Sequence, residues 1–178
     1  MQKIDYSHGV DNFYVAKGKT YRNPHEERVQ NIVKLMHAKH NLQKYVGNSI
    51  LDFACGSGEA TLALKRIINS NTVKFSFSDP YTSQSLQKRI PDAECLNYTF
   101  MDVVNGKLEG RYDLCILSYA FHLVPDNIVA PFTLALAFNC KFLLLIHPHK
   151  RGKEVNGFNL LVEEKYDQTV AYLYSSIY

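Results

Sequence analysis

The chain has 178 residues, which suits one domain with a single sizeable hydrophobic core. Hydrophobic residues make up 46% of it and charged residues 21%, as in an ordinary soluble globular protein. The net charge of +3 is too small to require a nucleic-acid partner, although it permits one. The start, Met-Gln-Lys-Ile-Asp, carries no apolar signal region, and no apolar run reaches the roughly 18 residues of a membrane span. We therefore expect a soluble, cytoplasmic protein.

The four cysteines stand far apart in the chain, and no two of them form a Cys-x-x-Cys pair. Three fall in expected strands and one in a glycine-rich turn; they are Cys55, Cys95, Cys115 and Cys140. This usage predicts small buried apolar side chains in a reducing compartment, and no zinc site.

The N-terminal segment, residues 1–23, is rich in aromatic and basic side chains and shows little periodicity, so we expect a loop or a short helix. The run Asn23-Pro24-His25-Glu26 then predicts a helix start, with Asn23 as N-cap and Glu26 completing a capping box. Apolar residues follow at helical spacing, at Val29, Ile32, Val33 and Met36. This helix is expected to lay one face on the core and to end near residues 45–47.

Buried-strand patterns alternate with helical patterns through the middle of the chain. The expected strands span residues 50–53, 73–78, 95–100, 112–119 and 141–147. The expected helices span residues 59–68, a short stretch through Leu86 and Ile90, and residues 131–138. Alternation at this spacing predicts right-handed crossover units and a parallel sheet. Residues 157–166 and 169–178 are two further strand-like runs, and the two residues between them allow only an antiparallel hairpin.

The first expected strand runs directly into a glycine-rich turn, Asp52-Phe-Ala54-Cys55-Gly56-Ser-Gly58. Glycines at such a turn let the backbone approach a ligand without a clash from a Cβ atom. One interpretation is a dinucleotide fingerprint, Gly56-x-Gly58-x-x-Thr61, although threonine then replaces the glycine or alanine that tight helix packing needs. The other interpretation counts from Asp52, a carboxylate inside the strand.

The longer run from Asp52 to Gly58 resembles motif I of the class I S-adenosylmethionine-dependent methyltransferases. The terminal hairpin is a second mark of that family, since a dehydrogenase domain usually lacks it. The resemblance covers residues 49–147 and implies one α/β Rossmann-like domain over residues 1–178. Its mostly parallel seven-stranded sheet would end in the antiparallel hairpin, with helices on both faces. Residues 1–47 would form a lid segment and a helix, and residues 48–178 the core.

Ligands of open α/β sheets bind outside the carboxyl ends of the strands, so side chains there are candidates. The glycine turn offers Asp52, Ala54, Cys55, Gly56 and Gly58, whose backbone would cradle the amino-acid half of S-adenosylmethionine. By the resemblance, Asp52 also orients the cofactor's ammonium group.

The second strand ends in Asp79 and Pro80, and the carboxylate there is suited to both ribose hydroxyls. The resemblance implies that Asp102 faces the adenine amino group, that Val103 packs on the ring, and that Ser118 adds a contact. It also makes Tyr14 and Arg22 candidates for a lid, with Arg22 reaching the cofactor carboxylate. The alternatives are that Asp79 only forms a turn, and that Asp102 lies in a solvated turn.

Three side chains near the ends of the fourth and fifth strands are candidate catalytic groups: Tyr119, His122 and His147. A histidine would act as general base if the acceptor carries a proton, and Tyr119 would orient it. The alternative is that both histidines are satisfied polar residues at the rim of the site.

The acceptor is not specified by these patterns. The expected loop at residues 148–157 is short for this family, and it carries Lys150, Arg151 and Lys153. With Lys17, Lys19 and Arg22 these residues would rim a shallow cleft suited to RNA, an acidic protein or a partner subunit. A small-molecule acceptor remains open. The rival functions are an inactive, cofactor-binding subunit and a nicotinamide-dependent reductase.

Overall fold

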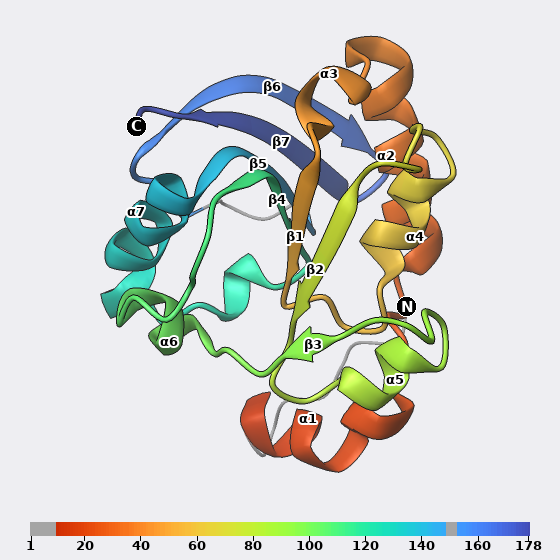
Figure 1. The fold of residues 1–178 in the computed structure, drawn as a ribbon, viewed down its shortest axis with the longest axis vertical. Helices are drawn as coiled ribbons and strands as arrows, with labels where there is room; N and C mark the ends of the chain where they lie inside the picture. The colour runs from red at the N-terminus through yellow and green to blue at the C-terminus, as the bar shows by residue number, and fades with distance from the viewer. Residues whose placement is uncertain (1–9, 149–152) are drawn as a thin grey trace.

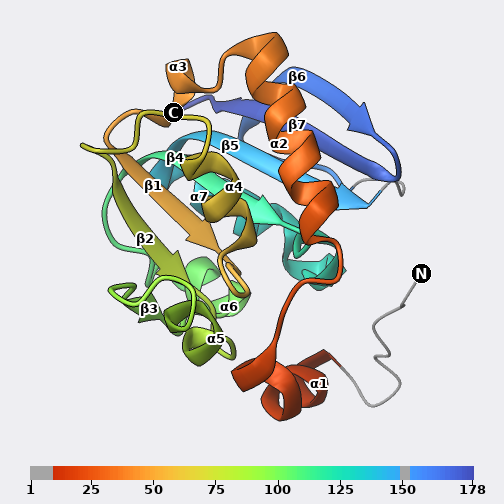
Figure 2. The same cartoon turned by 90° about the vertical axis from the view of Figure 1, so that its right-hand side faces the viewer.

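One mixed β-sheet runs through the molecule between two layers of helices (Figures 1 and 2). The computed structural model describes residues 10–148 and 153–178, except the side chains of Val10, Asp11, Phe13 and Tyr14. The strands are β1 (Ser49–Phe53), β2 (Lys74–Ser78), β3 (Cys95–Leu96), β4 (Tyr112–Ser118), β5 (Cys140–Pro148), β6 (Phe158–Tyr166) and β7 (Thr169–Ser176).

The helices lie on both faces of this sheet, with α2 and α4 against one face and α6 and α7 against the other. The α-helices are α1 (Val10–Lys17), α2 (Glu26–His40), α3 (Gln43–Val46), α4 (Glu59–Lys65), α5 (Ser83–Gln87), α6 (Phe100–Val104) and α7 (Val129–Asn139). Three short 3₁₀ helices are η1 (Gly18–Thr20), η2 (Phe121–Leu123) and η3 (Asp126–Ile128). Among the described residues, no helix is long and apolar enough to cross a membrane.

The strand order is β3-β2-β1-β4-β5-β7-β6, with β7 antiparallel to both β5 and β6 and every other pair parallel. This confirms the predicted seven-stranded, mostly parallel sheet with a terminal antiparallel hairpin and helices on both faces. The chain moves outward from β1 to β3 and then returns to β4. The order therefore reverses between β1 and β4, and a ligand crevice is expected at their carboxyl ends.

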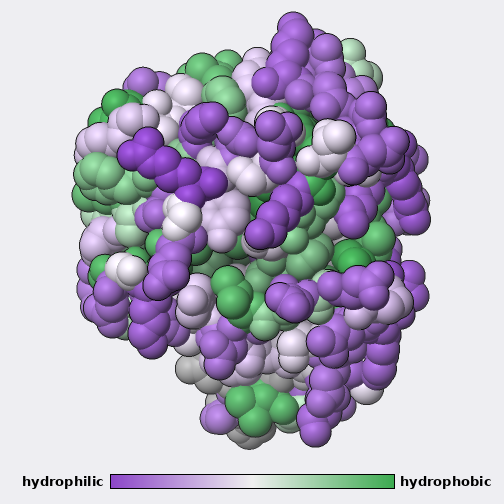
Figure 3. Space-filling view, viewed as in Figure 1, coloured by the Kyte–Doolittle hydropathy of each residue, from purple (hydrophilic) through white to green (hydrophobic). Residues whose placement is uncertain are grey.

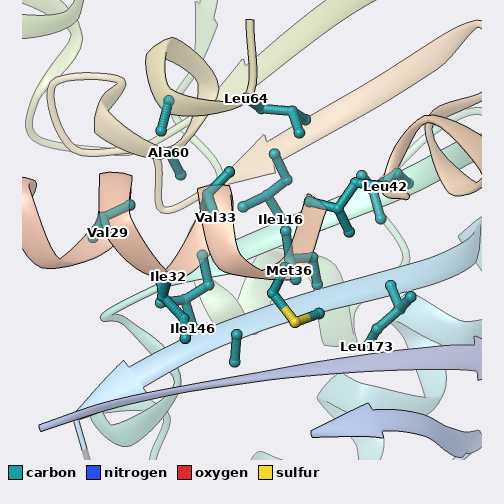
Figure 4. Close-up of a cluster of buried hydrophobic side chains, with 14 of the residues drawn as sticks. Val29, Ile32, Val33, Met36, Leu42, Ala60, Leu64, Ile116, Ile146 and Leu173 are labelled. Atoms are coloured by element: carbon teal, nitrogen blue, oxygen red, sulfur yellow. The ribbon is translucent and has the colours of Figure 1, made fainter. Parts of the chain in front are cut away.

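The helix-spaced apolar residues of α2 form the centre of one core layer (Figure 4). All four predicted positions are 0–1% exposed: Val29, Ile32, Val33 and Met36. They pack against α4 and against side chains of the central strands, among them Ile116 and Ile146. The helix ends at His40, earlier than predicted, because Asn41 adopts the left-handed conformation (φ 51°) that asparagine tolerates.

The capping box predicted at the start of α2 is absent among the described residues, because the helix begins at Glu26 with His25 as its N-cap and no side chain caps it. The Asn23 side chain instead accepts a hydrogen bond from the His25 N–H (2.8 Å) in the turn before the helix. The Asn23 N–H, however, donates to Glu59 of α4 (2.9 Å) and not to Glu26. The start of α2 is therefore tied to another helix, which a local pattern does not reveal.

The strand predicted over residues 95–100 is wrong beyond Leu96. Thr99 instead caps α6, where its side chain accepts from the Asp102 N–H (3.2 Å) and the Asp102 carboxylate accepts from the Thr99 N–H (2.9 Å). This reciprocal cap starts a helix and outweighs the apolar run that suggested a strand.

Candidate functional site

A cavity of about 490 Å³ opens at the carboxyl ends of β1, β2 and β4, where the strand order reverses. Its walls come from those three strand ends, from the turn before α6, and from Tyr21 in the N-terminal segment. On the face seen in Figure 3, hydrophobic side chains show through near the centre and are bordered by hydrophilic ones. The size suits a small organic ligand or cofactor.

The glycine loop, residues 54–58, has an unusual backbone where it leaves β1. Ala54 (φ 53°), Gly56 (φ 57°) and Gly58 (φ 82°) all have positive φ values. Such a conformation is strained for alanine, and strain of this kind collects at functional sites. A Cβ atom on Gly56 would lie 2.9 Å from the Tyr21 ring, so this residue faces the cavity and admits no side chain.

Gly58 has a different role from the one its place in the motif suggests. A Cβ atom there would lie 2.9 Å from Leu86 Cδ1 and 3.1 Å from Ile90 Cδ1, in the packing beside α5. Gly58 does not line the cavity. A side chain at Gly58 would therefore meet Leu86 and Ile90, and Gly56 is the glycine of this loop that lines the cavity.

Asp79 joins the end of β2 to the glycine loop. Its carboxylate accepts the Gly56 N–H (3.1 Å) on one oxygen, and the N–H groups of Tyr81 (2.9 Å) and Thr82 (3.0 Å) on the other. Thr82 in turn donates its hydroxyl to the Gly56 carbonyl (2.8 Å). Burial raises the pKa of Asp79 above its ordinary value, against the effect of these hydrogen bonds. The carboxylate thus fixes the loop and also lines the cavity.

Two buried oxygens near the ends of β1 and β4 have no hydrogen-bond partner among the described residues: Asp52 Oδ1 and Ser118 Oγ. Asp52 is 1% exposed, and its other oxygen accepts the Thr61 hydroxyl (2.6 Å). Burial raises the pKa of Asp52 to about 7, and the nearby Glu59 carboxylate adds to the shift. Buried polar atoms nearly always have a hydrogen-bond partner. Each of these two oxygens is therefore a position where a hydrogen bond from a bound ligand would be favourable.

Asp102 does not reach the cavity. Its carboxylate accepts the Thr99 N–H and hydroxyl (2.8 Å) and pairs with Lys107 (2.7 Å), and these bonds lower its pKa to about 2. Val103 is 1% exposed in the core beneath α6. The adjoining turn instead presents Tyr98, Thr99, Phe100 and Met101 to the cavity. Asp102 and Val103 therefore do not line the cavity, whereas these four residues do.

The N-terminal segment reaches the cavity through Tyr21, whereas Arg22 pairs with Glu26 (2.9 Å) and does not line it. Tyr14 lies in α1, but its side chain is outside the described part of the chain. Cys55 is buried behind the loop, with its sulfur 4.0 Å from that of Cys95.

The residues predicted as catalytic lie toward the other end of the crevice. Tyr119 (φ 54°) lines the cavity; its hydroxyl bonds to Thr169 (2.6 Å) and its ring stacks on His25 (5.0 Å between centroids). His147 is 5% exposed and stacks on Tyr172 (5.4 Å). His122 is exposed in η2, past the end of β4. Neither histidine lines the cavity.

Six predicted site residues thus line the cavity: Ala54, Gly56, Asp79, Pro80, Ser118 and Tyr119. Eight others do not: Arg22, Asp52, Cys55, Gly58, Asp102, Val103, His122 and His147. Sequence reasoning missed Tyr21, Thr82 and the cavity-lining residues 98–101. For Tyr21 a signal existed, since it lies closer in the chain than Tyr14 to the helix start predicted at Asn23. No local signal pointed to Thr82.

Two of the predicted rim residues are paired with acids: Arg22 bonds to Glu26 (2.9 Å), and Lys153 bonds to Asp126 (2.8 Å) and to the Val124 carbonyl. Lys17 and Lys19 are exposed. Lys150 and Arg151 lie outside the described residues. The described residues contain no group of three His, Cys, Asp or Glu side chains placed to hold a metal ion.

Comparison with known proteins extends this description. No family model matches the chain. An uncharacterised protein of Schizosaccharomyces pombe is 28% identical over 185 residues, which cover 83% of this chain and 74% of that protein.

Solved structures are similar in fold at low sequence identity. Magnesium protoporphyrin IX methyltransferase from Synechocystis, solved with bound SAM, gives a TM-score of 0.61 at 18% identity, over 96% of this chain and 92% of that one. A putative RNA methyltransferase from Pyrococcus horikoshii gives 0.61 at 15% identity, over 91% and 87%. A putative methyltransferase from Escherichia coli gives 0.60 at 18% identity, over 87% and 88%. As the sequence resemblance predicts, the chain has the Rossmann-like fold of the class I methyltransferases.

Proposed function

We propose that this protein is an S-adenosylmethionine-dependent methyltransferase. The observation that carries the proposal is the cavity at the strand-order reversal, where Asp79 fixes the glycine loop and the buried Ser118 hydroxyl oxygen has no partner among the described residues. The solved structure of the Synechocystis methyltransferase with bound SAM supports the choice of cofactor. The antiparallel terminal hairpin argues against the nicotinamide-dependent reductase.

The residues present fit this cofactor. The Asp79 carboxylate lines the cavity, and backbone N–H groups take three of its roughly four acceptor positions, which leaves about one for a ribose hydroxyl. Gly56 lines the cavity beside it. Asp52 Oδ1 and Ser118 Oγ are a buried acceptor and a buried hydroxyl that ligand groups would satisfy. Tyr98, Phe100 and Met101 supply the apolar wall that a purine ring needs.

The cofactor would supply a methyl group bound to a positively charged sulfur, ready for in-line displacement. The chain then has to position an acceptor and exclude water. Tyr119 is suited to positioning, because it lines the cavity and its ring is held between His25 and Thr169. We retain His147 and His122 as candidate bases, but either one would have to move to reach an acceptor in the cavity. An acceptor that needs no base would fit the described geometry better.

The second candidate function is an inactive, cofactor-binding subunit of a partner protein. One observation favours it: polar groups near this end of the crevice are already bonded within the chain, as Tyr119 is to Thr169 of β7 and Arg28 of α2 is to Asp167 of the β6–β7 turn. The acceptor itself is either RNA or another large anionic molecule, or a small molecule. The paired Arg22 and Lys153 give the anionic acceptor little support, so Lys17, Lys19 and residues 150 and 151 are the predicted rim cations that would have to provide it.

The cytoplasm is the compartment that we propose. All four cysteines are free thiols, as expected where disulfides are reduced.

A transfer assay tests the proposed function. The protein is incubated with methyl-labelled S-adenosylmethionine and, separately, with RNA, protein and small-molecule fractions of a cell extract. We expect label in one fraction, and its loss with Asp79→Ala. Binding of the cofactor without transfer to any fraction would favour the inactive subunit, and no binding of the cofactor would contradict the proposal itself.

A further inference from the structure

We propose that Glu59 and Arg89 are positioning residues, which hold the N-terminal strap over the cavity so that Tyr21 closes its wall above Gly56. The strap is defined as residues 18–25, between α1 and α2. The identity of the ligand under Tyr21 rests on the proposed function, but the anchoring of the strap does not.

The first end of the strap is fixed to α5. The Gly18 carbonyl accepts the Ser85 hydroxyl (2.6 Å), and the Lys19 carbonyl accepts the Lys88 ammonium (3.0 Å). Gly18 is buried so closely that a Cβ atom would lie 2.2 Å from the Tyr81 carbonyl oxygen. The contact brings the strap next to Tyr81, which itself lines the cavity.

The second end is fixed to the glycine loop through Glu59. Glu59 is the first residue of α4 and is only 4% exposed. One of its oxygens accepts the backbone N–H of Asn23 (2.9 Å) and the hydroxyl of Ser57. A single carboxylate thus connects the strap with the glycine loop.

Arg89 supplies the positive charge that makes this buried carboxylate possible. Its guanidinium lies 3.5 Å from Glu59, donates to the Ser57 hydroxyl (3.2 Å), and bonds to Glu26 of α2 (2.6 Å). Arg22 pairs with the other oxygen of Glu26, so the group holds two carboxylates and two guanidinium groups. A buried charge is tolerated only when it is paired, so the buried Glu59 carboxylate depends on Arg89, whereas the Arg22 side chain is 75% exposed and contributes less.

Tyr21 lies between the two anchored ends and is the part of the strap that lines the cavity. Its ring carbon Cε1 is 2.9 Å from the position of a Cβ atom on Gly56, and Glu59 Oε2 is 3.2 Å from the same position. The Glu59 carboxylate, which holds the strap, and the Tyr21 ring therefore lie on the same side of Gly56. A substitution that weakens the hydrogen bond between Glu59 and the strap should make Tyr21 more mobile. It would leave every cavity-lining residue in place.

Ligand release tests this inference through a double-mutant cycle. The dissociation rate of S-adenosylmethionine is measured for wild type, Glu59→Gln, Tyr21→Ala and the double variant. We expect Glu59→Gln to speed release about tenfold in the wild type, and to have no further effect in the Tyr21→Ala background. Arg89→Lys keeps the positive charge, so S-adenosylmethionine should dissociate from it more slowly than from Arg89→Ala. Glu164→Gln is the matched control, since that carboxylate pairs with Lys39 and His40 on the far side of α2.

Amide hydrogen exchange of residues 18–25 in the ligand-free protein provides a readout independent of the cofactor. Glu59→Gln should lower protection of the strap, and Glu164→Gln should leave it unchanged. An additive effect of Glu59→Gln and Tyr21→Ala on release, or an unchanged strap in Glu59→Gln, would overturn the inference. If the wild type does not bind S-adenosylmethionine, the proposed function fails, and hydrogen exchange alone decides whether Glu59 anchors the strap.

Discussion

The two ends of the crevice differ in how their polar groups are satisfied. At the β1 and β2 end, the glycine loop is strained at Ala54, and Asp52 Oδ1 is buried without a partner among the described residues. At the β4 and β5 end, the side chains bond to one another, as Tyr119 does to Thr169. We call these the loop end and the tyrosine end.

This difference indicates that the loop end is the part of the crevice that is preorganised for a ligand. Unpaired buried atoms and backbone strain cost free energy in the ligand-free protein, and binding at the loop end would recover part of it. The tyrosine end also holds an oxygen without a partner among the described residues, Ser118 Oγ, and a positive φ at Tyr119, but the Tyr119 hydroxyl is already bonded to Thr169. An acceptor that uses this hydroxyl must therefore compete with an existing bond. The following substitutions test the contrast, from the largest expected effect to the smallest.

Gly58→Val should be the most damaging single change. A valine there must adopt φ near 82° and fit beside Leu86 and Ile90, and we expect a loss of about 2–5 kcal/mol in unfolding free energy. Gly106→Val is the control, because Gly106 has φ 79° but nothing lies within 4 Å of its Cβ position. Urea unfolding of both variants separates strain from crowding. Equal losses in the two variants would show that Gly58 has no packing role.

Asp52→Asn should alter how stability depends on pH. The folded-state pKa of about 7 lies above the ordinary value, so the unfolded chain releases this proton first and wild-type stability falls as pH rises from about 4 to 7. The neutral amide removes that loss, which is on the order of 4 kcal/mol at most. Urea unfolding of the ligand-free proteins at pH 5 and pH 8 measures it. A wild type whose stability advantage over the variant grows between these pH values would contradict the raised pKa.

Asp79→Ala should weaken binding of S-adenosylmethionine by about 1–3 kcal/mol, through loss of a charge-assisted contact and of support for the Gly56 N–H. Isothermal titration measures the change, with Asp92→Ala as the control because Asp92 is exposed and distant from the loop in the chain. An unchanged dissociation constant in a folded Asp79→Ala variant would remove the carboxylate from the site.

Tyr119→Phe should have the smallest effect, since it removes only the hydroxyl and its bonds to Thr169 and Arg28 at the tyrosine end. We expect thermal unfolding to show a loss of about 0.5–1.5 kcal/mol in stability, with cofactor affinity unchanged. The same substitution at Tyr166, whose exposed bond to Asn31 is 3.4 Å long, should cost less. Weaker cofactor binding in Tyr119→Phe would show that the two ends of the crevice are not separate.

The sequence predicted the parts of this molecule that depend on local patterns. The sheet followed from strand spacing, and the residues of α2 that pack on the core followed from helical spacing. The glycine loop and Asp79 were found because a turn motif and a strand end are local as well.

The missed features depend on contacts between distant segments. Glu59 meets Asn23 across 36 positions in the chain, and Thr82 meets Gly56 across 26, so neither bond leaves a local signal. Asp102 was misplaced because its carboxylate caps its own helix, and the same residues read as a strand end when the cap is overlooked. His147 was placed at the right strand end, but its stacking on Tyr172 depends on the pairing of β5 with β7.

Isothermal titration of the wild-type protein with S-adenosylmethionine, and separately with NADH, tests the central claim most directly. The structure predicts saturable binding of S-adenosylmethionine at one site per chain, and no heat from NADH beyond dilution. Binding of NADH in place of S-adenosylmethionine, or binding of neither compound by the folded protein, would contradict the proposed function.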